Sequence, residues 1–148
     1  MSRIKRLDII YVCIQFILLA IFFVPIIPTS FQLFSFVKYI GAIISLLGFV
    51  VILVAILQLN KNLTPFPTPK ERGELINTGL YKFVRHPIYS GIFLGSFGIA
   101  LYTGSYWQLF VSITLLILFY FKSNYEESLL IQKYTDYKEY MKKTRKFF

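Results

Sequence analysis

Residues 79–91 read Gly79-Leu80-Tyr81-Lys82-Phe83-Val84-Arg85-His86-Pro87-Ile88-Tyr89-Ser90-Gly91 and contain the only histidine in the chain. They lead from a polar, proline-rich segment into an apolar one. Because proline lacks an N–H and its φ is preset for a helix, Pro87 favours the first helical turn. His86 is then expected at or beside the N-cap, where several backbone N–H groups have no partner within the helix. Together with Arg85, this predicts an anion-binding corner at the mouth of a membrane helix.

Composition excludes an ordinary soluble domain. Of the 148 residues, 56% are hydrophobic and only 16% are charged, and the mean hydropathy is +0.62. Long apolar runs of this kind are typical of membrane spans. The length predicts one domain covering residues 1–148. The single cysteine and single histidine provide neither an intrachain disulfide nor the usual ligands of a zinc site.

The apolar runs predict an all-α, polytopic membrane protein. A basic head precedes the first run, but no small-residue cleavage site follows, so it is interpreted as a retained helix rather than a signal peptide. Alternating prolines between residues 65 and 69 exclude a helix or central strand there, and predict an extended loop on the membrane surface. The C-terminal residues repeat aromatic and lysine side chains at helical spacing, which predicts an interfacial helix. The expected spans are 9–28, 39–59, 88–104 and 106–121, with a cytoplasmic loop over 60–87 and a C-terminal helix over 123–143.

Small residues recur on one face of the second and third predicted spans. Gly41, Ser45 and Gly48 share a face of the second, and Gly91, Gly95 and Gly98 line the third. Such faces allow membrane helices to approach closely. For the third span, an equally weighted alternative is that its flat glycine face accommodates a ligand or a lipid tail.

Charge asymmetry predicts the topology. Of the 16 basic residues, all but Lys38 lie in the head, the proline-rich loop or the tail. By the positive-inside rule, four spans then place both termini in the cytoplasm. The expected location is a prokaryotic cytoplasmic membrane, crossed by a multi-pass chain. The basic tail could suggest nucleic acid, but the adjoining span favours lipid headgroups, so the bilayer is the expected partner.

Glu126 and Glu127 stand about one turn beyond the last apolar run. Carboxylates at the edge of the hydrocarbon are costly unless paired, so they indicate a site. The alternative is an exposed interfacial pair that orients Lys122 and Lys133.

The ordered set Arg85-His86-Pro87-x-Tyr89-x-Gly91, then Glu126-Glu127-x-Leu129-Leu130, resembles the isoprenylcysteine carboxyl methyltransferases and the related phospholipid N-methyltransferases. The likeness extends upstream through Asn62-Leu63-Thr64-Pro65 and downstream to Tyr137 and Tyr140. It covers roughly residue 60 to the C-terminus. The sequence departs from the family in having at most Lys122 where an arginine often precedes the acidic pair.

This resemblance implies a membrane enzyme that uses S-adenosyl-L-methionine to methylate a lipophilic or lipidated acceptor. Glu126, Glu127 and Arg85 are the implied catalytic residues. The implied cofactor-binding residues are Glu74, Leu75, Ile76, Tyr81, His86, Pro87, Tyr89, Gly91, Glu126 and Tyr137.

The cofactor's groups also suit these residue types. A helix N-terminus with Arg85 and His86 can hold a carboxylate, a glutamate can hold an ammonium or ribose, and tyrosine faces suit a cation. A prenylcysteine-like carboxylate is the favoured acceptor because it needs no base, whereas a phospholipid amine must first lose a proton. Two other functions are weighed: a non-catalytic membrane subunit that keeps the fold, and a small transporter. A transporter is disfavoured because Gln15 is the only clearly polar mid-span residue.

Overall fold

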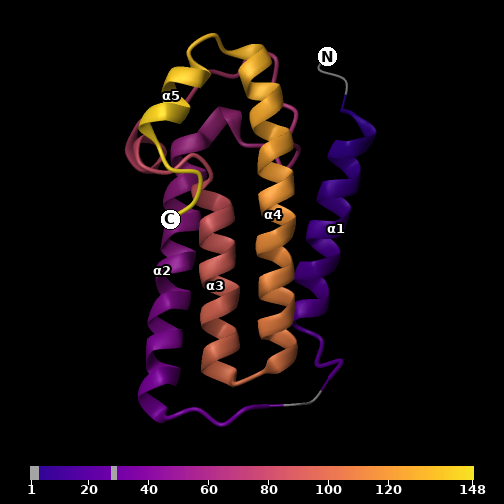
Figure 1. The fold of residues 1–148 in the computed structure, drawn as a ribbon, viewed down its shortest axis with the longest axis vertical. Coiled ribbons are helices and arrows are strands. Elements are labelled where there is room, and N and C mark those ends of the chain that lie inside the picture. Colours follow the sequence, from indigo (N-terminus) through magenta and orange to yellow (C-terminus); the bar gives the residue numbers. More distant parts are fainter. Residues whose placement is uncertain (1–3, 28–29) are drawn as a thin grey trace.

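The structure is a computed structural model that describes residues 4–27 and 30–148. Four long helices lie side by side, in the spatial order α2, α3, α4 and α1 (Figure 1). They are α1 (Arg6–Phe22), α2 (Ser35–Leu59), α3 (Pro87–Thr103) and α4 (Tyr106–Lys133), followed by the short α5 (Tyr137–Lys143). Two 3-10 turns, η1 (Asn60–Asn62) and η2 (Gly79–Lys82), interrupt the connection between α2 and α3. The predicted all-α class is confirmed over the described residues.

The predicted start of the third helix is confirmed in detail. His86 is the N-cap of α3 and Pro87 occupies its first turn. At the other end, Gly104 caps α3 with a φ of 68°, in the left-handed region that favours glycine. Ser105 then caps α4 by accepting a hydrogen bond from the Gln108 amide at 3.3 Å. This tight turn makes α3 and α4 antiparallel neighbours.

Two predicted boundaries are wrong. The fourth span does not end at 121 before a separate helix over 123–143, because α4 continues unbroken to Lys133 and α5 covers only Tyr137–Lys143. The polar residues after 121 do not end the helix because several, such as Ser123 and Glu127, are buried against neighbouring elements. The first helix ends at Phe22 and does not continue toward Pro28, because residues 23–27 are not helical. Pro28 itself and the basic head residue Arg3 lie outside the described residues.

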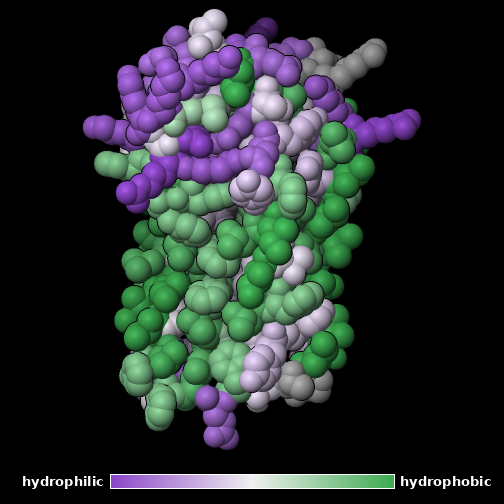
Figure 2. All heavy atoms as spheres, in the orientation of Figure 1, coloured by the Kyte–Doolittle hydropathy of each residue, from purple (hydrophilic) through white to green (hydrophobic). Residues whose placement is uncertain are grey.

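Apolar side chains surround the bundle below a polar end (Figure 2). In the described part of the chain, α2 with its continuation to Asn62 and α4 are long and apolar enough to cross a membrane. Only 22% of the apolar window of α2 is buried, whereas the core helix of a soluble protein would be mostly buried. The helices α1 and α3 have 17 residues each, or about 25 Å against a hydrocarbon core of about 30 Å. Four spans therefore remain a prediction.

The small residues of α2 and α3 face each other. A Cβ placed on Gly48 would lie 2.4 Å from the Gly95 amide nitrogen, and one placed on Gly98 would lie 2.4 Å from that of Ser45. A Cβ on Gly91 would meet Ile52 and the Gly48 carbonyl. The close-packing interpretation is confirmed, and the alternative of a lipid tail on this face is wrong at Gly91 and Gly98 because α2 occupies the space.

Candidate active site

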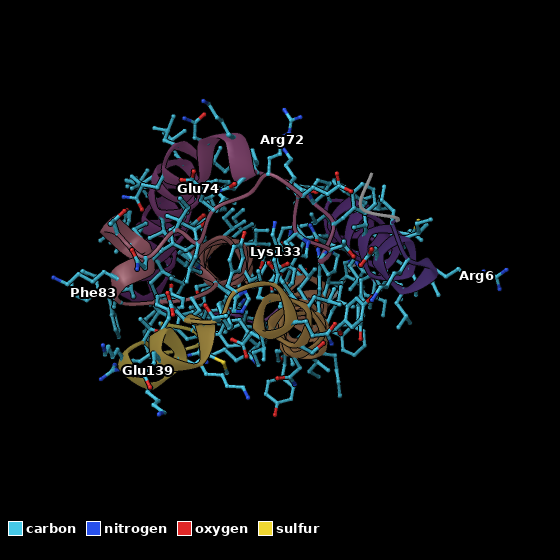
Figure 3. The ribbon with its side chains drawn as sticks, turned by 90° about the horizontal axis from the view of Figure 1, so that it is seen from above. Arg6, Arg72, Glu74, Phe83, Lys133 and Glu139 are labelled. Carbon is cyan, nitrogen blue, oxygen red and sulfur yellow. The ribbon has the colours of Figure 1, made fainter. Side chains whose placement is uncertain are left out.

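One end of the bundle, here called the polar end, gathers segments that are distant in the sequence. Residues 60–86 cover it on one side, and the last turns of α4 with α5 cover it on the other (Figure 1). Figure 3 looks onto this end and shows Arg72, Phe83 and Glu139 pointing outward around its rim. Lys133 reaches from α4 to the loop, where its ammonium donates to the Lys70 carbonyl. The segments thus enclose the N-terminus of α3.

Arg85 and His86 converge on one carboxylate. The Arg85 Nε donates to Glu127 Oε1 at 2.7 Å, and the His86 Nε2 lies 3.1 Å from the same oxygen. His86 is 5% exposed, and the side chains of Arg85 and Glu127 are 9% and 7% exposed. Arg85 also donates to the Met141 carbonyl at 3.1 Å. Arg85 therefore joins α4 to the end of α5, and much of its donor capacity is already used.

Glu126 has different surroundings from those of Glu127. Its Oε2 accepts a hydrogen bond from the Tyr89 hydroxyl at 2.7 Å and lies 3.8 Å from His86 Nδ1. Its side chain is 25% exposed. The His86 and Tyr89 rings stack in parallel with centroids 5.3 Å apart, and Tyr89 stacks in turn on Phe119 at 4.7 Å. This column of rings holds the Tyr89 hydroxyl against a carboxylate that stays accessible.

The C-terminal residues after α5 pair with the chain beside the histidine. Val84 and Arg145 form an isolated parallel bridge. The backbone amides of Arg85 and His86 donate to the carbonyls of Arg145 and Lys146 at 2.9 and 3.2 Å. Lys146 Nζ also lies 3.3 Å from Glu127 Oε2. Sequence reasoning missed this pairing, because no local pattern indicates which distant segment a short tail will meet.

A first cavity lies between the proline-rich loop and the α4–α5 corner, with about 660 Å³ of space including the part open to solvent. Asn62 holds the loop in place: its side chain donates to the Glu74 carbonyl at 3.0 Å and accepts from the Glu74 amide at 3.2 Å. The wall combines aromatic rings with polar groups. Its lining includes Asn62, Thr64, Glu74, Leu75, Ile76, Tyr81, Arg85, His86, Glu126, Tyr134, Tyr137 and Tyr140.

A second cavity adjoins the first on the side of the apolar helices. It has about 850 Å³ of space by the same measure and is lined mainly by apolar side chains of α2, α3 and the loop. Gln15 from α1 and Lys122 from α4 add polar groups to its wall. The two cavities share six lining residues: Leu59, Thr64, Tyr81, Arg85, His86 and Glu126. They therefore meet at the Arg85-His86 corner and at Glu126.

Three tyrosines around the first cavity, Tyr81, Tyr137 and Tyr140, remain protonated over the physiological range. Burial raises the pKa of Tyr137, and nearby Glu127 and Glu126 raise it further. Burial also raises the pKa of Tyr81. It raises the pKa of Tyr140 to about 12. Their hydroxyl groups are thus available as neutral donors, as in the bond from Tyr140 to the Tyr81 carbonyl at 2.5 Å.

Most of the sequence-predicted site residues lie on these two cavities. The strip 74–76 and Tyr137 line the first, Pro87 and Tyr89 line the second, and Tyr81 lines both. Gly91 lines neither cavity; it packs against α2, which accounts for a glycine there without a ligand.

The two glutamates of the acidic pair face different neighbours. Leu130 and Tyr134 line the first cavity together with Glu126. Glu127 faces Arg85 and His86 instead. Lys122 forms no ion pair with Glu126, because its ammonium donates to Gln15 Oε1 at 2.6 Å and to the Pro65 carbonyl at 3.0 Å. The alternative of an exposed interfacial pair is wrong for Glu127, which is buried.

Gln15 and Lys122 were not among the expected site residues. The signal that could have found Gln15 was present, because a lone polar side chain in an apolar run indicates a site or a polar partner. Its partner Lys122 lies on a helix that only the tertiary structure brings beside α1.

The polar end and its paired cavities define a helical bundle with an apolar body and a candidate site at its polar end. Residues 37–137 match the phospholipid methyltransferase family. This match covers more than half of the chain, so the protein belongs to that family of membrane methyltransferases. None of the curated proteins matches the chain closely enough to count as a relative. The family match contains both cavities' shared residues but not Gln15 or the C-terminal tail.

Proposed function

We propose that this protein transfers a methyl group from S-adenosyl-L-methionine to a lipophilic acceptor at the junction of the two cavities. The observation that carries the proposal is the sharing of His86, Glu126 and Tyr81 between a polar, aromatic cavity and an apolar one. A water-soluble donor and a lipid-soluble acceptor need different entrances but one common meeting point. The arrangement supports this division, with the acceptor in the apolar cavity.

The residues of the first cavity fit the chemistry of the donor. When bound, S-adenosyl-L-methionine would supply a methyl group: the acceptor bonds to the methyl carbon, and the sulfur, initially cationic, departs as a neutral thioether. Aromatic rings such as Tyr81 and Tyr137 can face a cation. Glu126, held by Tyr89 but still a quarter exposed, can face an ammonium or a ribose hydroxyl. Arg85 is largely engaged by Glu127, so we assign it to holding the corner together rather than to direct contact with the donor.

The chain's contribution to the rate would be positioning and exclusion of water. The buried His86 and the ring column fix the corner, and the C-terminal pairing closes it from one side. Holding two reactants in line can account for a large part of a transfer barrier. A prenylcysteine-like carboxylate is the favoured acceptor, because it is a nucleophile without loss of a proton. A phospholipid amine would need a base, and Glu126 is the carboxylate that lines both cavities.

The test is binding and turnover with the purified protein in nanodiscs. S-adenosylhomocysteine should raise the midpoint of thermal unfolding by mass action. His86→Ala should weaken that binding, because it removes a ring that lines both cavities and stacks on Tyr89. Membranes incubated with methyl-labelled donor should yield a labelled lipid or lipidated peptide by mass spectrometry. Absence of binding in the wild-type protein would reject the enzyme and favour a non-catalytic subunit.

A further inference from the structure

The second cavity contains a buried lysine whose surroundings differ from those of the other lysines in the described chain. Lys122 is 1% exposed, whereas fully buried lysines are rare in proteins unless a carboxylate pairs with them. Its ammonium donates to Gln15 Oε1 at 2.6 Å and to the Pro65 carbonyl at 3.0 Å. Among the described residues, no carboxylate forms an ion pair with it. The atoms that accept its hydrogen bonds are therefore neutral oxygens, and Asp8 and Glu126 act on its charge only from beyond ion-pair distance.

Such an arrangement costs free energy. Burying a charge without a directly paired opposite charge is unfavourable even when hydrogen bonds are made, and ionisable groups inside membrane bundles commonly mark a site for a ligand or ion. An ammonium has three donors, and two of those of Lys122 have acceptors in the described chain. The Tyr89 ring lies 5.1 Å from the ammonium and stabilises the cation on one face. A third donor is left for a ligand in the cavity that Lys122 lines.

The cavity is lined by residues of two helices that do not pack closely on each other. Its wall includes Gln15 of α1 and Ile56 of α2. Yet α1 packs on α4 and α2 packs on α3, with no extended packing between α1 and α2 in the described chain. These two helices stand on opposite sides of the bundle in Figure 1. Apolar side chains cover the bundle below the polar end (Figure 2), so an apolar tail that extends from the cavity along the bundle would meet apolar surroundings.

We infer that Lys122, held by Gln15, binds the anionic head group of a membrane amphiphile, either a carboxylate or a phosphodiester. This inference deepens the proposed function, on which it rests, by naming the class of acceptor. Lys122 and Glu126 are one turn apart on the same helix and line the same cavity. A head group on Lys122 therefore lies within about one helical turn, roughly 6 Å, of the junction with the first cavity.

The experiment compares four amphiphiles with the same chain length, added to the purified protein in an uncharged detergent. They are palmitate, palmitoyl lysophosphatidylglycerol, palmitamide and hexadecylamine, and the readout is the dissociation constant from the shift of the thermal unfolding midpoint. One or both anionic amphiphiles should bind at least about tenfold more tightly than the amide, as expected for a charge-assisted hydrogen bond in a dry site. Palmitate alone would indicate a carboxylate acceptor, and the lysolipid alone a phosphodiester. Equal binding of all four, or a preference for the amine, would overturn the inference.

Variants separate this site from the general positive charge of the protein. Lys122→Met should abolish the preference for anionic head groups. Gln15→Leu should weaken it, because it removes a hydrogen bond that positions the ammonium. Lys142→Met is the matched control, since Lys142 is 72% exposed and pairs with Glu139 on the surface. A preference that survives in Lys122→Met, or disappears in Lys142→Met, contradicts the site.

If Lys122→Met does not fold, Gln15→Leu and the head-group preference of the wild-type protein still decide the question. Binding of S-adenosylhomocysteine to the wild-type protein is measured in the same samples. Donor binding without head-group preference rejects only the Lys122 site. Head-group preference without donor binding rejects only the proposed methyl transfer.

Discussion

At the scale of single residues, neighbouring side chains have separate tasks. Glu126 and Glu127 are adjacent in sequence, but about 100° apart around a helix. Glu127 is buried among Arg85, His86 and Lys146, which makes it part of the structural framework. Glu126 lines both cavities and keeps one hydrogen bond from Tyr89. The two carboxylates should therefore respond differently to the same substitution.

Glu126→Gln is expected to reduce methyl transfer nearly to background while leaving expression and the unfolding midpoint close to wild type. Glu127→Gln should instead destabilise the fold by about 3 kcal/mol, because it leaves buried cations without their carboxylate. Methylation rate and thermal unfolding of both variants at matched protein level provide the measurement. Wild-type rates in both variants would show that neither carboxylate serves the reaction.

Tyr140 makes stability depend on alkaline pH. Its pKa is raised by burial to about 12 in the folded protein, against about 10 for an exposed tyrosine. The folded state therefore holds a proton that the unfolded state has lost, so this contribution is complete below pH about 10 and disappears as pH rises toward about 12. Tyr140→Phe should show a shallower fall of unfolding midpoint than wild type over this interval. Parallel curves for the two proteins would contradict the assignment.

At the scale of elements, the contact between α2 and α3 depends on backbone approach. Gly41, Ser45 and Gly48 on α2 meet Gly91 and Gly98 on α3, at distances that leave no room for a Cβ. Without a hydrophobic force between helices in lipid, such close packing is a main source of association. It also positions the N-terminus of α3, and hence His86, relative to the proline-rich loop.

Gly98→Ala is expected to lower stability by about 1–3 kcal/mol, because its Cβ would overlap the backbone of Ser45. Gly95→Ala is the matched control on the same helix, since a Cβ there meets nothing within 4 Å. It should be neutral, or slightly stabilising because alanine favours a helix over glycine. The unfolding midpoints in detergent test the pair. Equal loss in both variants would mean that helix propensity or lipid contact, rather than close approach, governs this face.

At the scale of the whole molecule, the polar end collects nearly all of the charge. The connection between α2 and α3, the end of α4, α5 and the tail all lie there, while Lys38 follows the start of α2 at the opposite end (Figure 1). By the positive-inside rule, we propose that the polar end faces the cytoplasm. A donor that dissolves in the cytosol would then reach the first cavity directly.

Cysteine labelling in intact cells tests this orientation. The background is Cys13→Ala, because Cys13 is exposed. A membrane-impermeant maleimide should label Ser35→Cys, which lies at the exposed start of α2, and should not label Asn77→Cys, which is exposed at the polar end. Permeabilised cells provide the control, since both variants should then react. The reverse pattern in intact cells would invert the molecule in the membrane and place the site outside.

Sequence reasoning placed the start of α3 correctly, because the signal there is local. The proline at position 87 predicts the N-cap at His86, and the apolar run after it predicts α3. Sequence reasoning failed to predict features that depend on contacts between distant segments. These are the continuation of α4 past residue 121, the pairing of Arg145 beside His86, and the partner of Lys122. Each of these depends on which segment fills a space, and a linear pattern of residues does not contain that information.

By itself, the sequence determined the all-α class, the membrane character and the corner at Arg85-His86-Pro87, because apolar length, charge bias and proline geometry act within a few residues. Only the tertiary structure decided which glutamate faces the cavities. It also showed that the glycines serve packing against α2, and that Gln15 and Lys122 meet in one wall. The physical reason is that burial and pairing are properties of the space between helices. Adjacent residues differ by about 100° around a helix, so Glu127 is buried against Arg85 and His86 while Glu126 lines the cavities.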